Sequence, residues 1–403
     1  MSNISTAAPS ALDAQMKRTT AREMFRLAAA YFRSDSVNAS GHELFVLLPR
    51  FNACVRLSPD AVRLYFDHVH AHRSWRARAF RAALMVLARG PKALAGLVPS
   101  LPLYKPQEAY PSTDWSAIDV LLAEWQFVGA FSGAHQSVSH ILTDAQYERC
   151  FENEMGARNE MRPFVPMPRT VRIERGESRG WTEQFFPNDA SLSERQRPFS
   201  DLQTAMCHAY VETGETISVT AHLAHLRARI DRSYLPGVND PIADRLRKLL
   251  EWTRAQAARE GIESLRLARG HGDFNPGQVL SAGGNHVLID WSESERGVVF
   301  HDYVQSALWF YGWRDLAAPV DVPALYTMRD GLSDELDRLS PLLAVALVLV
   351  EVGAKQHMDY TQRRGTFRSW MALASETLTL AGASGADQPA TVPSLRDDSH
   401  VQS

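Results

Sequence analysis

The side chains best suited to chemistry are concentrated in one segment, residues 270–291. Residues 270–280 read Gly-His-Gly-Asp-Phe-Asn-Pro-Gly-Gln-Val-Leu, and a Gly-Gly-Asn turn at 283–285 separates them from a second short apolar run. Two apolar runs around such a turn predict a β-hairpin. A hairpin places the loop before its first strand beside the end of its second strand. We therefore expect Asp273 to lie near Asp290, although 17 positions separate them.

Asp273, Asp290 and the amide of Gln278 would form an oxygen-rich site. Mg²⁺ prefers oxygen ligands and usually takes one or two carboxylates, with phosphate and water oxygens completing its coordination. A carboxylate in the loop can also orient or deprotonate an acceptor hydroxyl. The three side chains together predict phosphoryl transfer.

Three motifs in a fixed order resemble a known family. His-Gly-Asp at 271–273 is followed by the amide of Gln278, then by Ile-Asp-Trp at 289–291 and His-Asp-Tyr at 301–303. This pattern looks like the catalytic core of aminoglycoside phosphotransferases, choline kinases and related small-molecule kinases with the protein-kinase-like fold. The resemblance implies that Asp302 is buried and braces the catalytic loop.

The same resemblance implies roles for the other residues of this segment. Asp273 would be the catalytic base, with His271 and Asn275 as further catalytic residues of its loop. Gln278 and Asp290 would bind Mg²⁺. The nucleotide would be ATP or GTP, and the acceptor would be a hydroxyl of a small molecule.

The resemblance continues upstream in a weaker form. Residues 138–142, followed by residues 147–154, are similar to the family's strand with the phosphate-binding lysine and the helix with its glutamate partner. This match implies His140 at the lysine position and Glu154 as the glutamate.

A later segment, residues 181–186, resembles the hinge behind which the adenine packs. Backbone groups of Glu183, Gln184 and Phe185 would then hydrogen-bond the base.

Two residues depart from the family pattern. Gln278 stands where the family has asparagine and is one methylene longer. His140 replaces the lysine, and a histidine with a pKa of about 6.5 is only partly charged at neutral pH. The chain has no lysine between Lys105 and Lys248, so Arg149 or another arginine would have to supply a permanent charge. A pseudokinase-like binding or scaffold protein is therefore the alternative to an enzyme.

Composition excludes several other classes of function. The chain has 403 residues, 22% of them charged, and a net charge of −3, which gives no field for bulk nucleic-acid binding. Its longest apolar run, 342–350, is about half of the roughly 20 residues that a membrane span needs. The run predicts a buried helix that is capped by Ser340 and starts at Pro341. Three cysteines far apart and no secretory signal favour a cytoplasmic protein, and the oligomeric state stays open.

The expected fold is α+β, with a small β-rich N-lobe, a mainly helical C-lobe and an extra N-terminal helical segment. Strands are predicted within 126–142, at 170–174 and at 181–186, and a helix within 145–161. The proposed boundaries are a disordered tail over 1–40, a mainly helical extension over 41–114, an N-lobe over 115–188, a C-lobe over 189–381 and a disordered tail over 382–403.

Three further patterns have a structural and a functional interpretation, and in two of them the structural one is favoured. His68 and His72 form a surface cluster rather than a metal site. The aromatic residues Trp291, Trp309, Tyr311 and Trp313 pack in the core rather than caging a quaternary ammonium. Residues 292–295, Ser-Glu-Ser-Glu, fit an exposed polar loop and a site for a cationic acceptor equally well.

An apolar stripe in the helix predicted around residues 75–87 is expected to face the core. It comprises Trp75, Ala79, Ala82, Ala83, Val86 and Leu87.

Overall fold

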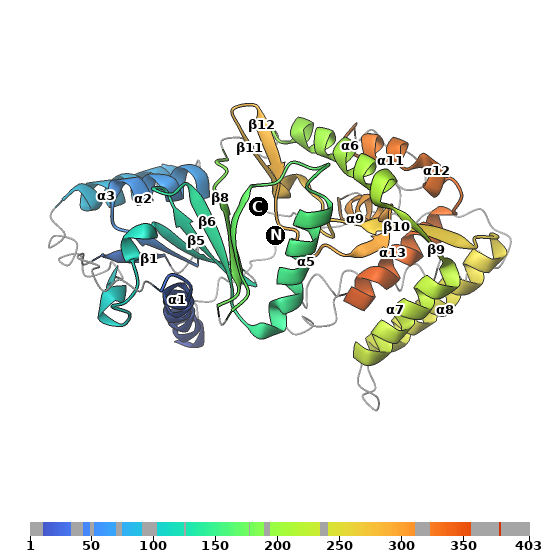
Figure 1. Cartoon of the computed structure of the whole chain (residues 1–403), viewed down its shortest axis with the longest axis horizontal. Coiled ribbons are helices and arrows are strands. Elements are labelled where there is room, and N and C mark those ends of the chain that lie inside the picture. The colour runs from blue at the N-terminus through green and yellow to red at the C-terminus, as the bar shows by residue number, and fades with distance from the viewer. Residues whose placement is uncertain are drawn as a thin grey trace, which may run out of the picture. The chain divides into compact units, whose positions relative to one another are not determined.

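Figure 1 shows the chain as a computed structural model. Its described residues fall into two compact units, each treated by itself below. The first takes its described residues from Met1–Phe151, Met167–Ser191 and Leu280–Ile289, and the second from Glu152–Pro166, Leu192–Val279 and Asp290–Ser403. The structure describes residues 11–33, 43–48, 52–69, 75–90, 103–124, 126–176, 178–188, 194–233, 241–310, 323–355 and 379.

An antiparallel sheet of eight strands forms the first unit, in the order β3-β1-β2-β4-β5-β6-β8-β7. Its strands are short and rich in β-branched and aromatic residues, which suit a pleated surface. They are β1 (Phe45–Leu48), β2 (Ala53–Arg56), β3 (Leu103–Tyr104), β4 (Val120–Ala123), β5 (Phe127–Ser132), β6 (Ser137–Leu142), β7 (Thr170–Glu174) and β8 (Gly180–Gln184).

The strands predicted within 126–142 and over 170–186 are confirmed as β5 to β8. Their register places His140 of β6 opposite Gly129 of β5 on one side and opposite Trp181 of β8 on the other. The helix predicted after β6 is also confirmed as α5 (Glu148–Glu160), which follows a short 3₁₀ turn.

The prediction of a separate, mainly helical extension over 41–114 is wrong. The segment does contain α2 (Pro59–Leu64), the π-helix η2 (Tyr65–Val69) and α3 (Trp75–Arg89). However, its strands β1, β2 and β3 continue the sheet, since β2 pairs directly with β4. Short apolar runs of four residues cannot be assigned to strand or helix by periodicity alone, which explains the error.

The prediction of a disordered tail over 1–40 is wrong where the structure describes that segment. Helix α1 (Ala11–Tyr31) buries Met24, Phe25 and Ala28 in the core of the first unit. It packs on β4, β5 and β6, and the ring of Phe25 meets that of Trp115 edge to face at 5.5 Å. Many alanines lowered the apparent apolarity of a stripe that has enough large side chains to pack. The predicted tail over 382–403 lies outside the described residues.

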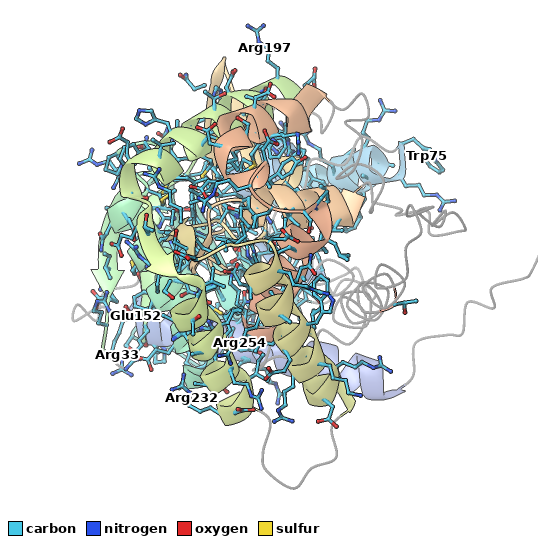
Figure 2. All side chains as sticks on the ribbon, turned by 90° about the vertical axis from the view of Figure 1, so that its right-hand side faces the viewer. Arg33, Trp75, Glu152, Arg197, Arg232 and Arg254 are labelled. Atoms are coloured by element: carbon cyan, nitrogen blue, oxygen red, sulfur yellow. The ribbon has the colours of Figure 1, made fainter. Side chains whose placement is uncertain are left out.

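Most of the apolar stripe of α3 faces away from the core, which corrects the sequence prediction, and only Leu87 of the stripe packs against a core cluster. Trp75 is 68% exposed and Val86 72% exposed, whereas Leu84 on the opposite face is buried. Figure 2 shows the side chain of Trp75 projecting from the ribbon. Helical spacing of apolar residues identifies candidate apolar faces of a helix. The packing of α3 against α2 determines which of these faces is buried.

The second unit is mainly helical and contains a small sheet in the order β13-β10-β9. Its helices α7 and α8 lie side by side, and α13 packs against α7, α8 and α9 (Figure 1). Its elements are α6 (Gln196–Thr213), β9 (Glu215–Ser218), α7 (Val219–Ser233), α8 (Pro241–Arg259), β10 (Ser264–Arg269), β13 (Arg296–Val298), α9 (His301–Phe310), α11 (Pro323–Gly331), α12 (Ser333–Leu336) and α13 (Pro341–Lys355).

Helix α13 confirms the buried helix predicted at Pro341. Ser340 caps it, because the Leu343 N–H donates to Ser340 Oγ at 3.2 Å. Among the residues that the structure describes, no helix is both long and apolar enough to cross a membrane. One β-rich unit and one mainly helical unit confirm the predicted α+β class.

Candidate active site

The loop that follows β10 carries the predicted catalytic residues, and it is fixed by hydrogen bonds to its backbone. The carboxylate of Asp302 accepts from the N–H of His271 at 2.7 Å and from the N–H of Gly272 at 2.8 Å. Asp302 is buried, as the resemblance implied. Burial by itself would raise the pKa of Asp302, but His301, His271 and the hydrogen bonds it accepts outweigh this effect and lower it.

Gly272 is required at the tightest point of this loop. Its φ is +85°, a left-handed conformation that glycine adopts without strain. A Cβ at this position would also overlap the carbonyl oxygen of Glu293. The glycine therefore allows the loop to pass closely under residues 292–295.

Helix α9 also holds the loop one residue beyond Asp273. The Ser306 hydroxyl donates to the carbonyl of Phe274 at 2.6 Å, and the Phe274 side chain is buried. With the bonds to Asp302, α9 fixes the backbone on both sides of Asp273.

Tyr210 of α6 supports the Asp302 carboxylate by donating its hydroxyl proton to it. Tyr210→Phe removes this charge-assisted bond, and we expect the free energy of unfolding to fall by about 1–2 kcal/mol. Urea denaturation measures this loss. An unchanged unfolding midpoint would show that Asp302 does not depend on the tyrosine.

The carboxylate of Asp273 is exposed and held by two amides. Asn275 Nδ2 donates to Oδ1 at 3.1 Å, and Gln278 Nε2 donates to Oδ2 at 3.0 Å. Desolvation by the surrounding protein and the negative charges of Asp290 and Glu293 raise the pKa of Asp273 above its ordinary value. The negative charge of Asp290 therefore acts on Asp273, in keeping with the proximity that the hairpin predicts.

The hairpin itself is formed by β11 (Val279–Ala282) and β12 (Asn285–Leu288), with Gly283 and Gly284 in left-handed conformations between them. This confirms the hairpin predicted from the Gly-Gly-Asn turn.

His271 lies fully buried beneath the loop. Its Nδ1 accepts from the backbone N–H of Asp273 at 3.3 Å, and its ring lies 4.7 Å from that of Trp291. In this position it supports the backbone of Asp273.

Asp290 follows the hairpin in a strained conformation, with φ of 62°. Its Oδ1 accepts from the Ser292 hydroxyl at 2.7 Å. The Asp290 side chain is exposed. The Gln278 amide donates to Asp273 through its nitrogen, so its oxygen takes no part in that hydrogen bond.

One carboxylate and one amide oxygen are the kinds of ligand that Mg²⁺ takes when it is shared with a nucleotide. No group of three or more acidic, histidine or cysteine side chains suited to a metal occurs in the part of the chain that the structure describes. Mg²⁺ on phosphates needs fewer protein ligands, since one or two carboxylates with water suffice.

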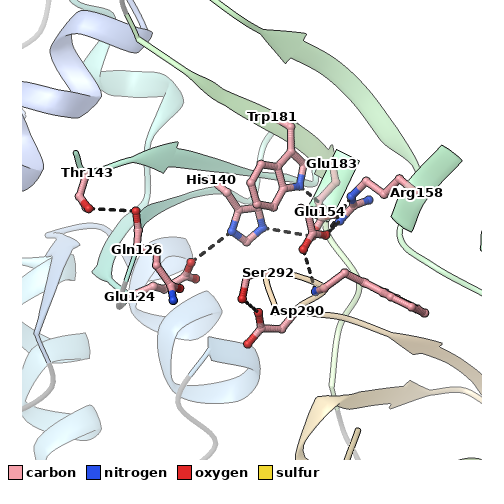
Figure 3. A network of polar contacts seen from close by, with 11 residues as sticks. Glu124, Gln126, His140, Thr143, Glu154, Arg158, Trp181, Glu183, Asp290 and Ser292 are labelled. Atoms are coloured by element: carbon pink, nitrogen blue, oxygen red, sulfur yellow. Dashed lines mark hydrogen bonds and ion pairs between the residues drawn. The ribbon is translucent and has the colours of Figure 1, made fainter. Parts of the chain in front are cut away.

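In the first unit, His140 lies between two carboxylates (Figure 3). Its Nδ1 is 3.2 Å from Glu124 and its Nε2 3.1 Å from Glu183, and its ring stacks on Trp181 at 4.5 Å. Burial by itself would lower the pKa of His140, but the two carboxylates outweigh it and raise the pKa to about 10. His140 is therefore a cation at neutral pH, and both of its N–H groups point at carboxylates.

Glu154 of α5 belongs to a different set of contacts, also drawn in Figure 3. It is buried, forms an ion pair with Arg158 at 2.8 Å, and accepts from the N–H of Trp291 at 2.7 Å. The predicted glutamate thus fixes the backbone directly after Asp290.

In the predicted hinge, residues 181–186, two backbone N–H groups already have hydrogen-bond acceptors. The N–H of Gln184 donates to the carbonyl oxygen of Arg169 at 2.8 Å, and the N–H of Phe185 donates to the carbonyl oxygen of Gln136 at 2.8 Å. These two N–H groups are therefore engaged within the first unit, and the contact of residues 183–185 with a base stays a prediction. Strand β8 is paired on both sides, which a sequence does not show.

Residues 292–295 are mainly structural. Ser294 is buried and donates to the Gly270 carbonyl at 2.7 Å, and Glu295 forms an ion pair with Arg229 at 2.7 Å. These contacts favour a structural role for residues 292–295, which support the loop at 270–275, over a binding site for a cationic acceptor.

The aromatic and histidine patterns are covered by the structure only in part. Trp291 is buried, as core packing predicts, whereas Tyr311, Trp313 and the side chain of Trp309 lie outside the described residues. His72 also lies outside them.

Sequence reasoning missed Glu124, Tyr210 and Glu351 as partners of site residues. Only Glu351 left a signal, because an acid within the apolar helix α13 needs a buried partner. Glu124 and Tyr210 meet their partners through strand register and helix packing, which the sequence does not specify.

Residues 207–342 match the profile described as the phosphotransferase enzyme family. They include the loop at 270–275, the hairpin and α9. The match confirms the resemblance seen in the motifs. No curated protein matches the chain.

Among solved structures, aminoglycoside phosphotransferase APH(4)-Ia resembles the chain. Its thermostable mutant in the apo form has a TM-score of 0.44 and 16% identity, over 66% of this chain and 94% of that one. A further variant of that mutant, in a ternary complex with AMP-PNP and hygromycin B, has a TM-score of 0.44 and 14% identity, with the same coverage. Glucosamine kinase in complex with glucosamine, ADP and inorganic phosphate has a TM-score of 0.37 and 16% identity, over 64% of this chain and 79% of that one.

Proposed function

We propose that this protein transfers a phosphoryl group from a nucleoside triphosphate to a hydroxyl of a small molecule. The observation that carries the proposal is the fixed loop at 270–275, which presents an exposed Asp273 beside Asp290 and Gln278. Such a loop supplies the two elements that phosphoryl transfer needs, which are positioning and charge.

Asp273 acts on the acceptor in this proposal. Its carboxylate orients the attacking hydroxyl and takes up its proton as the new bond to the γ-phosphorus forms, while the bond from that phosphorus to the bridging oxygen breaks and the nucleoside diphosphate leaves. A raised pKa makes it a better proton acceptor than an ordinary aspartate. Asn275 and Gln278 set the direction of its oxygens, and His271 supports its backbone.

Gln278 and Asp290 would hold Mg²⁺ in this proposal, and the bound ion would supply positive charge at the nucleotide phosphates. The hydrogen bond from Ser292 to Asp290 fixes the direction of that carboxylate.

ATP or GTP is the nucleotide. His140 contributes a positive charge on the first unit, and Glu154 fixes the backbone after Asp290. Backbone groups within residues 183–185 would contact the base. Hygromycin B and glucosamine, which are bound in the similar structures, are the first acceptors to test.

One observation favours a second candidate, a pseudokinase-like protein that binds without catalysis. Both ring nitrogens of His140 are already engaged by Glu124 and Glu183. A histidine in this state has no N–H left for phosphate oxygens unless one carboxylate moves away.

A thermal-shift titration tests the proposed function. Mg·ATP or Mg·GTP should raise the melting temperature in a saturable way, because a ligand that binds only the folded state stabilises it. The shift should shrink without Mg²⁺ and in Asp290→Asn. A melting temperature that stays constant up to millimolar nucleotide contradicts the enzyme proposal, and a shift without any turnover favours the pseudokinase.

A further inference from the structure

A carboxylate lies buried in the apolar helix α13. Glu351 is 2% exposed, and residues Leu343 to Ala354 around it are all buried. It has three donors, which are His222 Nε2 at 2.8 Å, His301 Nδ1 at 2.6 Å and the N–H of Val298 at 2.9 Å. An acid in such surroundings is retained at a large desolvation cost, so its partners must be held firmly.

The three donors come from three different elements. His222 belongs to α7, Val298 ends β13, and His301 is the first residue of α9. Burial by itself would raise the pKa of Glu351, but the hydrogen bonds from both histidines outweigh this and hold it well below its usual range. A Cβ on Gly297 would lie only 2.7 Å from Glu351 Oε2, so β13 approaches the carboxylate closely.

Two of these elements, α9 and β13, are connected by hydrogen bonds to the loop that carries Asp273 or to the strand that precedes it. Helix α9 binds that loop through Asp302 and through Ser306. Strand β13 pairs with β10, where Gly297 lies opposite Ala268, two residues before the loop. A shift at the start of α9 would therefore reach the loop through bonds that are already formed.

We propose that Glu351 is a positioning residue, which acts through His301 and the start of α9 to hold Asp273 in place. The inference rests on the proposed phosphoryl transfer, because positioning has a catalytic effect only if Asp273 meets a substrate. A misplacement of about 1 Å can cost about 100-fold in rate.

His222 provides a matched control for this proposal. It donates to the same carboxylate at a similar distance and is equally buried, but it comes from α7, which packs on α8 and α13. His222→Ala and His301→Ala therefore create similar vacancies beside Glu351, and only the second breaks the connection to α9.

The experiment compares His301→Ala, His222→Ala and Glu351→Gln in the full chain. Three quantities are measured: ADP formation from Mg·ATP with hygromycin B or glucosamine, the Kd of Mg·AMP-PNP, and deuterium uptake by residues 270–275. His301→Ala and Glu351→Gln should lower kcat about 100-fold with little change in Kd, and the loop amides should exchange faster. His222→Ala should lower the melting temperature but keep kcat and the slow exchange.

A conservative variant separates positioning from folding. In His301→Asn the amide nitrogen lies close to the place of Nδ1, so part of the lost kcat and of the slow exchange should return. Equal losses of kcat in the two alanine variants, or unchanged exchange in His301→Ala, would overturn the inference. If the wild-type protein forms no ADP, the proposed function fails, and the exchange measurement alone still decides whether Glu351 positions the loop.

Discussion

Asp273→Asn is expected to lower the rate of phosphoryl transfer about 10²–10⁴-fold, because an amide cannot take up the proton of the acceptor hydroxyl. The side chain is exposed, and Asn keeps its size, so the melting temperature should stay close to that of the wild type. The Kd for Mg·AMP-PNP should also change little, since Asp273 meets the acceptor and not the nucleotide. Steady-state ADP formation with each acceptor measures kcat and KM separately.

Asp330→Asn is the matched control for this variant. Asp330 is an exposed carboxylate of α11 and should leave kcat unchanged when replaced. If Asp273→Asn keeps wild-type kcat, another group must accept the proton, and the assignment of the loop is wrong.

His140→Gln is expected to remove a pH-dependent part of the stability. In the folded protein, Glu124 and Glu183 raise the pKa of His140 from 6.5 to about 10. A group whose pKa is raised by folding contributes stability that is complete below the unfolded pKa and is lost as the pH rises through the folded pKa. The contribution of His140 should therefore be complete below about pH 6.5 and vanish at about pH 10, with a size of about 2–4 kcal/mol.

Urea denaturation of wild type and His140→Gln between pH 6 and about 10.5 measures this contribution as a difference. The difference in unfolding free energy should shrink steadily as the pH rises, because the wild-type imidazole loses its proton. Glu124→Gln keeps the shape and removes one of the two charges, so its loss of stability should set in at a lower pH. A difference that stays constant across the range would contradict a charged His140.

The element types near the site follow from the sequence because their signals are local. Gly283 and Gly284 adopt the left-handed conformations that a tight hairpin needs, so the turn could be recognised from two residues. The position of Asp290 next to Asp273 then followed from the hairpin alone. Ser340 and Pro341 likewise mark the start of α13 through capping chemistry that involves only neighbouring residues.

The partners of the site residues could not be predicted because they depend on tertiary packing. Glu124 directly follows β4 and reaches His140 of β6 past Gly129 of the intervening strand β5, and Tyr210 meets Asp302 across 92 positions. The same reason explains the exposed stripe of α3, since the face that packs is chosen by α2 and not by the spacing of apolar residues.

The contacts of His140 bear on the absence of a lysine at this position of the chain. His140 occupies the expected position as a cation, but Glu124 and Glu183 already satisfy it. Nucleotide binding through His140 therefore requires that one carboxylate give way to phosphate oxygens. Affinity for Mg·AMP-PNP should accordingly rise in Glu124→Gln, and isothermal titration calorimetry measures that rise. An unchanged or weaker affinity would show that Glu124 does not compete with the phosphates.

The most direct test of phosphoryl transfer is a ³¹P NMR time course of Mg·ATP with the protein and either hygromycin B or glucosamine. The account predicts that ADP and a new phosphomonoester signal grow in equal amounts, and that both are absent in Asp273→Asn. ATP that remains intact although it binds, or that yields inorganic phosphate alone, would contradict transfer to a small-molecule hydroxyl.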